Sequence, residues 1–158
     1  MEVLEETRTQ ASAGANQYLT FSLAEETYGV DILRVQEIKG YVPTTRIPNT
    51  PPHVTGVLNL RGTIVPIVDL RSKFGLPAGV YDAFAAIVVV VVGGKVTGVI
   101  VDRVSEVMSI SPDDIQPPTE SAGVQFLQGL GKVGDSLIIL LDIEAVLSET
   151  DVELPLAA

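Results

Sequence analysis

Two stretches of this chain recur, in the same order, in its second half. Residues 29–38 align with residues 98–107, with Gly, Val, Arg, Val and Glu identical at the same offsets. Farther along, residues 64–70 align with residues 137–143, and each stretch precedes a short segment of helical character. A unit of about 60 residues buries too little apolar surface to be more than marginally stable alone. We therefore expect two related units that pack against each other.

The strongest apolar segment predicts a strand. Residues 83–92 are apolar throughout and include five consecutive Val, and Gly93 and Gly94 follow them. The β-branched residues favour an extended backbone, and the two glycines suit a primed hairpin turn. A membrane-spanning helix needs roughly twenty apolar residues. We therefore expect a buried strand that enters a hairpin, and no insertion of the chain into a membrane.

The remaining pattern of apolar and turn residues predicts further short elements. Pro66 cannot donate a ladder hydrogen bond, so we expect its strand at a sheet edge or at a bulge. Thr50 before Pro51 resembles the start of a brief helix. The Gly-rich segment 129–134 is interpreted as a mobile turn, because it lacks the spacing and the Ser or Thr of a phosphate loop. We expect strands at 18–23, 27–30, 56–60, 63–68 and 137–141, and short helical turns after Asp31 and Asp69.

Short strands separated by Gly and Pro predict an all-β fold of small barrels rather than alternating strands and helices. Residues 1–16 are expected to form a flexible acidic tail, and residues 151–158 a C-terminal tail. Residues 17–150 would form the folded part, with two subdomains at roughly 17–80 and 81–150. The repeat leaves strand exchange between these subdomains open.

The charge of the chain excludes one class of partner. The sequence holds 10 Lys and Arg residues and 20 Asp and Glu residues, which gives a net charge of −10. Nucleic-acid binding derives mainly from Lys and Arg that displace counterions from phosphates. We therefore expect no nucleic-acid partner.

The sequence offers little material for catalysis. It has no Cys, and its single His, His53, follows two prolines. No phosphate loop, dinucleotide fingerprint, nucleophile elbow or zinc-binding helix motif is present in it. We expect no catalytic residue, no metal and no cofactor. The enzyme alternative is a hydrolase that uses Glu37 or Asp102 as its carboxylate.

Two charged residues are candidates for recognition. Arg61 lies at a predicted turn between two apolar strands. It would either hold a local carboxylate such as Asp69 or present its planar guanidinium to a partner. Glu37 ends an apolar stretch, and it would either pair with Lys39 or Arg34 in solvent or contact a partner.

Five segments of the chain carry motifs of a known protein family. They are residues 28–38, 49–62, 64–71, 98–104 and 127–131. Together these segments resemble the CheW family of chemotaxis coupling (adaptor) proteins, and the resemblance extends from about Tyr18 to Leu147. It implies two SH3-like, five-stranded β-barrels packed around a shared hydrophobic core, with a few short helical turns.

The resemblance also implies a function and its partners. Proteins of this family are non-catalytic adaptors that couple the cytoplasmic tip of methyl-accepting chemoreceptors to the regulatory domain of the histidine kinase CheA. They are cytoplasmic and are recruited to membrane-associated receptor arrays. An adaptor of a related pathway, such as twitching motility, is the alternative. By resemblance, Val35, Glu37, Asn59 and Arg61 would face the groove for the receptor tip, and Gly98 would permit close approach nearby.

Overall fold

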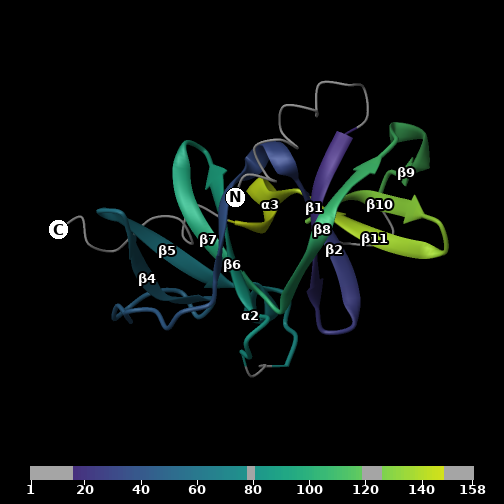
Figure 1. Ribbon diagram of the computed structural model, residues 1–158. Coiled ribbons are helices and arrows are strands. Elements are labelled where there is room, and N and C mark those ends of the chain that lie inside the picture. Colours follow the sequence, from purple (N-terminus) through teal and green to yellow (C-terminus); the bar gives the residue numbers. More distant parts are fainter. Residues whose placement is uncertain (1–15, 78–80, 119–125, 148–158) are drawn as a thin grey trace.

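The computed structural model describes residues 16–77, 81–118 and 126–147. They form two β-sheets joined by short helical turns, which confirms the expected all-β fold (Figure 1). Sheet A consists of β1 (Asn16–Leu23), β2 (Glu26–Asp31), β8 (Arg103–Ile110), β9 (Ile115–Gln116), β10 (Leu127–Val133) and β11 (Ser136–Leu141). Sheet B consists of β3 (Val35–Gly40), β4 (Val54–Leu60), β5 (Thr63–Asp69), β6 (Ala86–Val92) and β7 (Lys95–Val101). The helical turns are η1 (Ile32–Arg34), α2 (Leu70–Lys73), η2 (Pro112–Asp114) and α3 (Ile143–Val146).

The two expected tails lie outside the described residues, apart from Asn16, which begins β1. Within the described part of the chain, no helix is both long enough and apolar enough to cross a lipid bilayer.

Each sheet combines strands from both halves of the chain. In sheet A, β1 pairs with β8 and β2 pairs with β11. In sheet B, β6 pairs with β3 and β7 pairs with β5. The sheets therefore do not divide the chain near residue 80. The first two strands of each repeat lie in the sheet that the later strands of the other repeat form.

The pairing follows the sequence repeat residue by residue. Gly29 on β2 lies opposite Leu140 on β11, in parallel register. Its counterpart Gly98 lies opposite Ile67, and Ile67 is the residue that aligns with Leu140. The internal repeat is therefore a repeat of structure, and the chain crosses between sheets at two equivalent places. The first crossover is η1, and the second is Asp102 between β7 and β8.

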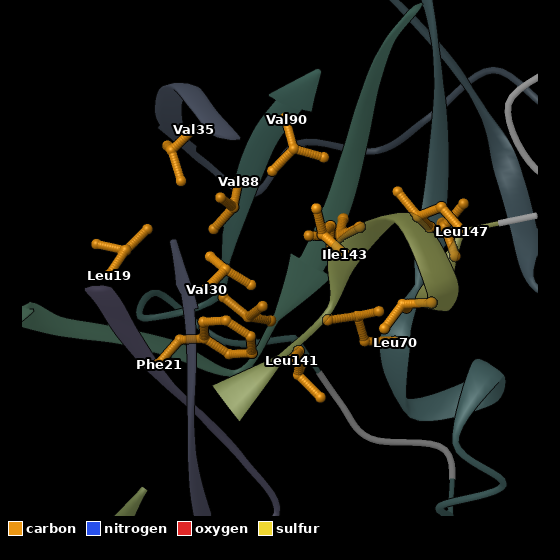
Figure 2. Packing of buried hydrophobic residues seen from close by; sticks show 14 of the residues in the cluster. Leu19, Phe21, Val30, Val35, Leu70, Val88, Val90, Leu141, Ile143 and Leu147 are labelled. Carbon is orange, nitrogen blue, oxygen red and sulfur yellow. The ribbon is translucent and has the colours of Figure 1, made fainter. Parts of the chain in front are cut away.

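The largest hydrophobic cluster lies between the two sheets (Figure 2). Sheet A supplies Leu19, Phe21 and Val30, and sheet B supplies Val88 and Val90. Leu70 of α2, Ile143 of α3 and Leu147 also belong to it. Two smaller clusters occupy the other faces of the sheets, and one of them contains Ile87 and Val89. Both faces of β6 are thus buried, which explains its unbroken apolar sequence.

Two local expectations are wrong, and a third holds in part. Strand β5 is internal, between β7 and β4, and not at an edge, but its pairing with β7 begins only at Ile67, one residue after Pro66. The expected irregularity is present nearby, because the register between β4 and β5 shifts between Val54 and Gly56, opposite Val68 and Ile67. A turn replaces the helix expected at Thr50 and Pro51, with the Val54 N–H donating to the Pro51 carbonyl at 3.0 Å.

Residues 129–133 belong to strand β10 and not to the turn that the glycines suggested. A Cβ at Gly129 would lie 2.7 Å from Ile115 Cγ2, so this glycine allows β9 to approach.

Candidate functional site

Arg61 and Glu37 meet at one side of sheet B. Glu37 lies on β3, which is one edge of the sheet, and Arg61 lies at the turn that follows β4, the other edge. The Arg61 Nη2 donates to Glu37 Oε2. The Glu37 side chain is only 15% exposed, whereas that of Arg61 is 73% exposed. A guanidinium carries five N–H donors, so this bond leaves others available to a partner.

The structure pairs the two recognition candidates with each other and not with the residues that the sequence suggested. Arg34, considered for Glu37, forms an ion pair with Glu144 at 2.6 Å. Asp69, considered for Arg61, accepts hydrogen bonds from the Arg71 N–H at 3.0 Å and from the Tyr81 hydroxyl. The pairing of Glu37 with Arg61 joins the two edges of sheet B.

The Arg61 side chain extends from a tight turn that a neighbouring amide stabilises. Arg61 and Gly62 both have positive φ angles, 51° and 91°, as the primed hairpin turns require. The Gly62 N–H donates to Asn59 Oδ1 at 2.8 Å. Asn59 thus fixes the conformation of the turn that presents Arg61.

Val35 and Glu37 lie on either side of an irregularity in β3. The pairing register with β6 shifts between these two residues, which makes Gln36 the extra residue of a β-bulge. Bulges redirect side chains and are over-represented next to functional sites. Val35 itself is 0% exposed and belongs to the cluster between the sheets (Figure 2). Its side chain therefore anchors the strand that carries Glu37.

Gly98 is buried within β7, where its missing side chain makes room for residues of its own sheet. A Cβ there would lie 2.6 Å from Ile67 Cδ1 and 2.9 Å from Ile87 Cγ2. Internal packing is therefore sufficient to explain the glycine at this position.

Replacement of Gly98 by Ala should test this packing role. We expect the free energy of unfolding to fall by about 1–3 kcal/mol, because the added methyl group overpacks the core of sheet B. Urea denaturation followed by circular dichroism measures this change. Gly40→Ala is the matched control, since a Cβ at Gly40 meets nothing within 4 Å. An equal loss of stability in the two variants would contradict the packing role.

A recess of about 320 Å³ adjoins the start of β3. It is lined by Leu33, Arg34, Val35, Gln36 and Val91. Leu33 is 68% exposed, although it is a large apolar residue. The sequence predicts only a helical turn at Leu33 and gives no sign of this exposure. Its exposure arises where the chain crosses from one sheet to the other.

The carboxylates considered for the enzyme alternative are both engaged in ion pairs. Asp102 accepts from Arg71 Nε at 2.8 Å and from Arg71 Nη2 at 2.5 Å. The hydrogen bond from Arg71 lowers the pKa of Asp102, and the bond from the Ala24 N–H acts in the same direction. A carboxyl group that acts as a general acid near neutral pH needs a raised pKa, so Asp102 is unsuited to that role.

The lowered pKa of Asp102 predicts how the free energy of unfolding depends on pH. The pKa of Asp102 is lower in the folded protein than its ordinary value of 3.8. Its contribution to stability is therefore complete above that value and is lost as the pH falls through the folded pKa. We expect the difference in unfolding free energy between the wild type and Asp102→Asn to stay constant from pH 7 to about pH 5 and to shrink below about pH 4. Denaturant titrations at several pH values measure it, and a difference that grows on acidification would contradict the assignment.

The described residues suggest no metal site. In residues 16–77, 81–118 and 126–147, no group of three or more His, Cys, Asp or Glu side chains could hold a metal ion. His53 Nδ1 lies 3.4 Å from Ser72 Oγ. The exposed groups near β3 include the Arg61 guanidinium, which contacts Glu37, and the Leu33 side chain, which lines the recess at the start of the strand.

Comparisons with known proteins agree over nearly the whole chain. The CheW-like domain model matches residues 17–151. The chain is 46% identical over 141 residues to the chemotaxis protein CheW of Klebsiella aerogenes, covering 87% of this chain and 85% of that protein. It is 35% identical over 154 residues to the chemotaxis protein CheW of Helicobacter pylori, covering 91% and 93%.

A solved structure shows the same fold. The crystal structure of the scaffolding protein TtCheW from Thermoanaerobacter tengcongensis matches with a TM-score of 0.82 and 35% sequence identity. The match covers 89% of this chain and 98% of that chain. Sequence and fold together show that the chain belongs to the CheW-like family.

Proposed function

We propose that this protein is a non-catalytic adaptor that couples methyl-accepting chemoreceptors to a CheA-type histidine kinase in bacterial chemotaxis. The observation that carries the proposal is its similarity to chemotaxis proteins named CheW over almost its whole length, at up to 46% identity among those compared above. The protein would act in the cytoplasm, at membrane-associated receptor arrays. Its partners would be the cytoplasmic tip of the receptor and the regulatory domain of the kinase.

The geometry around β3 supports a protein partner. An exposed guanidinium, an exposed Leu33 and a shallow recess suit an extended macromolecular surface better than a small ligand, which usually fills an enclosed pocket. Arg61 offers a planar fork of donors to a carboxylate or a backbone carbonyl of the receptor.

The five residues assigned to partner binding would act in two ways. Glu37 and Arg61 would contact the receptor tip as one ion pair, mainly through the Arg61 guanidinium, which is 73% exposed, while the Glu37 side chain is 15% exposed. Val35, Asn59 and Gly98 would act indirectly. Val35 anchors β3, Asn59 stabilises the β4–β5 turn, and Gly98 allows β7 to pack.

Co-sedimentation with receptor-containing membranes tests the proposal. The purified protein should sediment with membranes that contain the receptor, and the kinase should sediment fully only when the protein is also present. Autophosphorylation of the kinase, measured with labelled ATP, should rise in the complete mixture. Membranes without receptor are the control. Failure of the protein to associate with either partner would contradict the proposal.

The same assay separates the enzyme alternative from the adaptor. Under the adaptor hypothesis, Glu37→Gln should weaken sedimentation with receptor membranes. The other outcome is that Glu37→Gln leaves binding of both partners unchanged but abolishes the rise in kinase autophosphorylation. In that case the carboxylate has a chemical role, and the hydrolase alternative gains support.

A further inference from the structure

An ion pair lies at each of the two crossovers between the sheets. At the first crossover, Arg34 of η1 pairs with Glu144 of α3. At the second crossover, Asp102 pairs with Arg71 of α2. The repeat makes these places equivalent, since Arg71 aligns with Glu144, and Asp102 is one residue before the counterpart of Arg34. The charges are reversed between the two pairs, but the connection from a crossover to a short helix is the same.

The Arg71–Asp102 pair connects sheet B to sheet A. Arg71 lies on α2, which directly follows β5 of sheet B, and it donates two hydrogen bonds to Asp102. The same Asp102 carboxylate accepts from the Ala24 N–H at 2.9 Å, and the Asp102 N–H donates to the Ser22 carbonyl at 3.0 Å. Ser22 and Ala24 belong to the β1–β2 hairpin of sheet A. Arg71 on α2, the helix that follows β5 of sheet B, is thus linked through Asp102 to the β1–β2 hairpin of sheet A.

A second set of contacts holds α2 against sheet A. Phe74, which ends α2, stacks on Tyr28 of β2 with ring centroids 5.8 Å apart. It also stacks on Phe126, just before β10, at 5.8 Å. The helix is therefore fixed to sheet A through a charged contact and through an aromatic contact. Because α2 continues directly from β5, these contacts limit the rotation of sheet B relative to sheet A.

The two ion pairs differ in how far their side chains are buried. The side chains of Arg71 and Asp102 are 17% and 23% exposed, whereas those of Arg34 and Glu144 are 43% and 50% exposed. Exposed ion pairs contribute little because solvent screens them, and a bidentate guanidinium–carboxylate pair that is mostly covered is more restrictive in geometry.

We infer that Arg71 and Asp102 are positioning residues that hold the two sheets at one mutual orientation, and that this orientation is needed to transmit the state of the receptor to the kinase. The second part rests on the proposed function, in which one adaptor contacts two partners at once. A fixed orientation of the sheets would let a contact made at one sheet affect a contact made elsewhere on the protein. Neither residue needs to touch a partner for this role.

Distance measurement between spin labels tests the orientation directly. The chain has no Cys, so Thr63→Cys on β5 and Ser136→Cys on β11 introduce a unique pair of labelling sites. Double electron–electron resonance should give a narrow distance distribution for the parent protein and a broader or shifted one for Arg71→Gln. Arg34→Gln is the matched control and should leave the distribution unchanged. An unchanged distribution in Arg71→Gln overturns the inference, whatever the partners do.

Kinase stimulation in the reconstituted receptor mixture tests the second part. We expect Arg71→Gln to bind the receptor and the kinase separately with unchanged affinity, but to reduce receptor-dependent stimulation by about 2- to 30-fold. Asp102→Asn serves as a second variant if Arg71→Gln does not fold, because the Asn side chain still offers an acceptor to the Ala24 N–H. Undiminished stimulation despite an altered distance distribution overturns the transmission role. If the unsubstituted protein gives no stimulation, the proposed function fails, while the distance measurement still decides the positioning role.

Discussion

Replacement of Phe21 by Ala is expected to lower the free energy of unfolding by about 3–5 kcal/mol. Phe21 is 0% exposed in the cluster between the sheets, and its ring stacks on Tyr28 with centroids 6.0 Å apart. Truncation removes both the transfer free energy of the ring and its packing contacts, and it leaves a cavity that a rigid sheet fills poorly. Because domains of this size are stable by only about 5–15 kcal/mol, this one change should bring the protein close to unfolding.

The shared core also makes the expected loss cooperative. Both sheets contribute to the cluster around Phe21, so both should unfold in one transition with a lower midpoint. Urea titration followed by circular dichroism and by tyrosine fluorescence measures this, since the chain has four Tyr and no Trp. Phe84→Ala is the matched control, because Phe84 is 59% exposed. Two separate transitions in the Phe21 variant would contradict a core that the sheets share.

Replacement of Arg61 by Ala should weaken binding to the receptor tip by about 5- to 150-fold, or about 1–3 kcal/mol. The Arg61 guanidinium is 73% exposed in the free protein, and burial in an interface would convert its remaining donors into charge-assisted bonds. Fold stability should fall only modestly, by about 1 kcal/mol, because solvent screens the exposed guanidinium, whereas Glu37, which is 15% exposed, loses its partner. Isothermal titration with a receptor fragment measures the affinity, and thermal denaturation measures the stability.

A control and a double substitution make this prediction specific. Arg103→Ala on β8 of sheet A changes the net charge by the same amount and should leave receptor affinity unchanged. If Arg61 acts only by holding Glu37 in place, Glu37→Ala and the double variant should weaken binding as much as Arg61→Ala does. If Arg61→Ala mainly lowers the melting temperature and leaves the affinity unchanged, the role of Arg61 is structural.

Local sequence patterns predicted most of the elements but not their order in the sheets. The hairpin at Gly93 and Gly94 and the short helical turn after Asp69 both follow from side-chain chemistry within a few residues, and the structure confirms them. The internal position of β5 could not be predicted from the sequence, because Pro66 indicates only that its own backbone cannot donate a hydrogen bond. The place where pairing with β7 begins is a property of the assembled sheet.

The candidate site was predictable in its residues and not in its contacts. Glu37 and Arg61 were identified from their positions beside apolar strands, but their pairing depends on how β3 and the β4–β5 turn meet in space. The full burial of Val35 could not be predicted for a similar reason, since the alternation of side chains along β3 indicates only that this strand is half-buried. The bulge at Gln36 has no signal in the local sequence, because it arises from the register between β3 and β6.

The exchange of strands between the repeats affects how the chain folds during its synthesis. Neither half contains a complete sheet, so the protein resembles an obligate heterodimer whose two subunits are tethered by the connection from α2 to β6. During synthesis the first half emerges with the β1–β2 hairpin still lacking β8 and β11, so both outer edges of this hairpin stay unpaired until the second half arrives. The tether supplies the high effective concentration that lets the two halves find each other. Gene duplication followed by such an exchange would make each copy indispensable to the other, so neither could afterwards be lost alone.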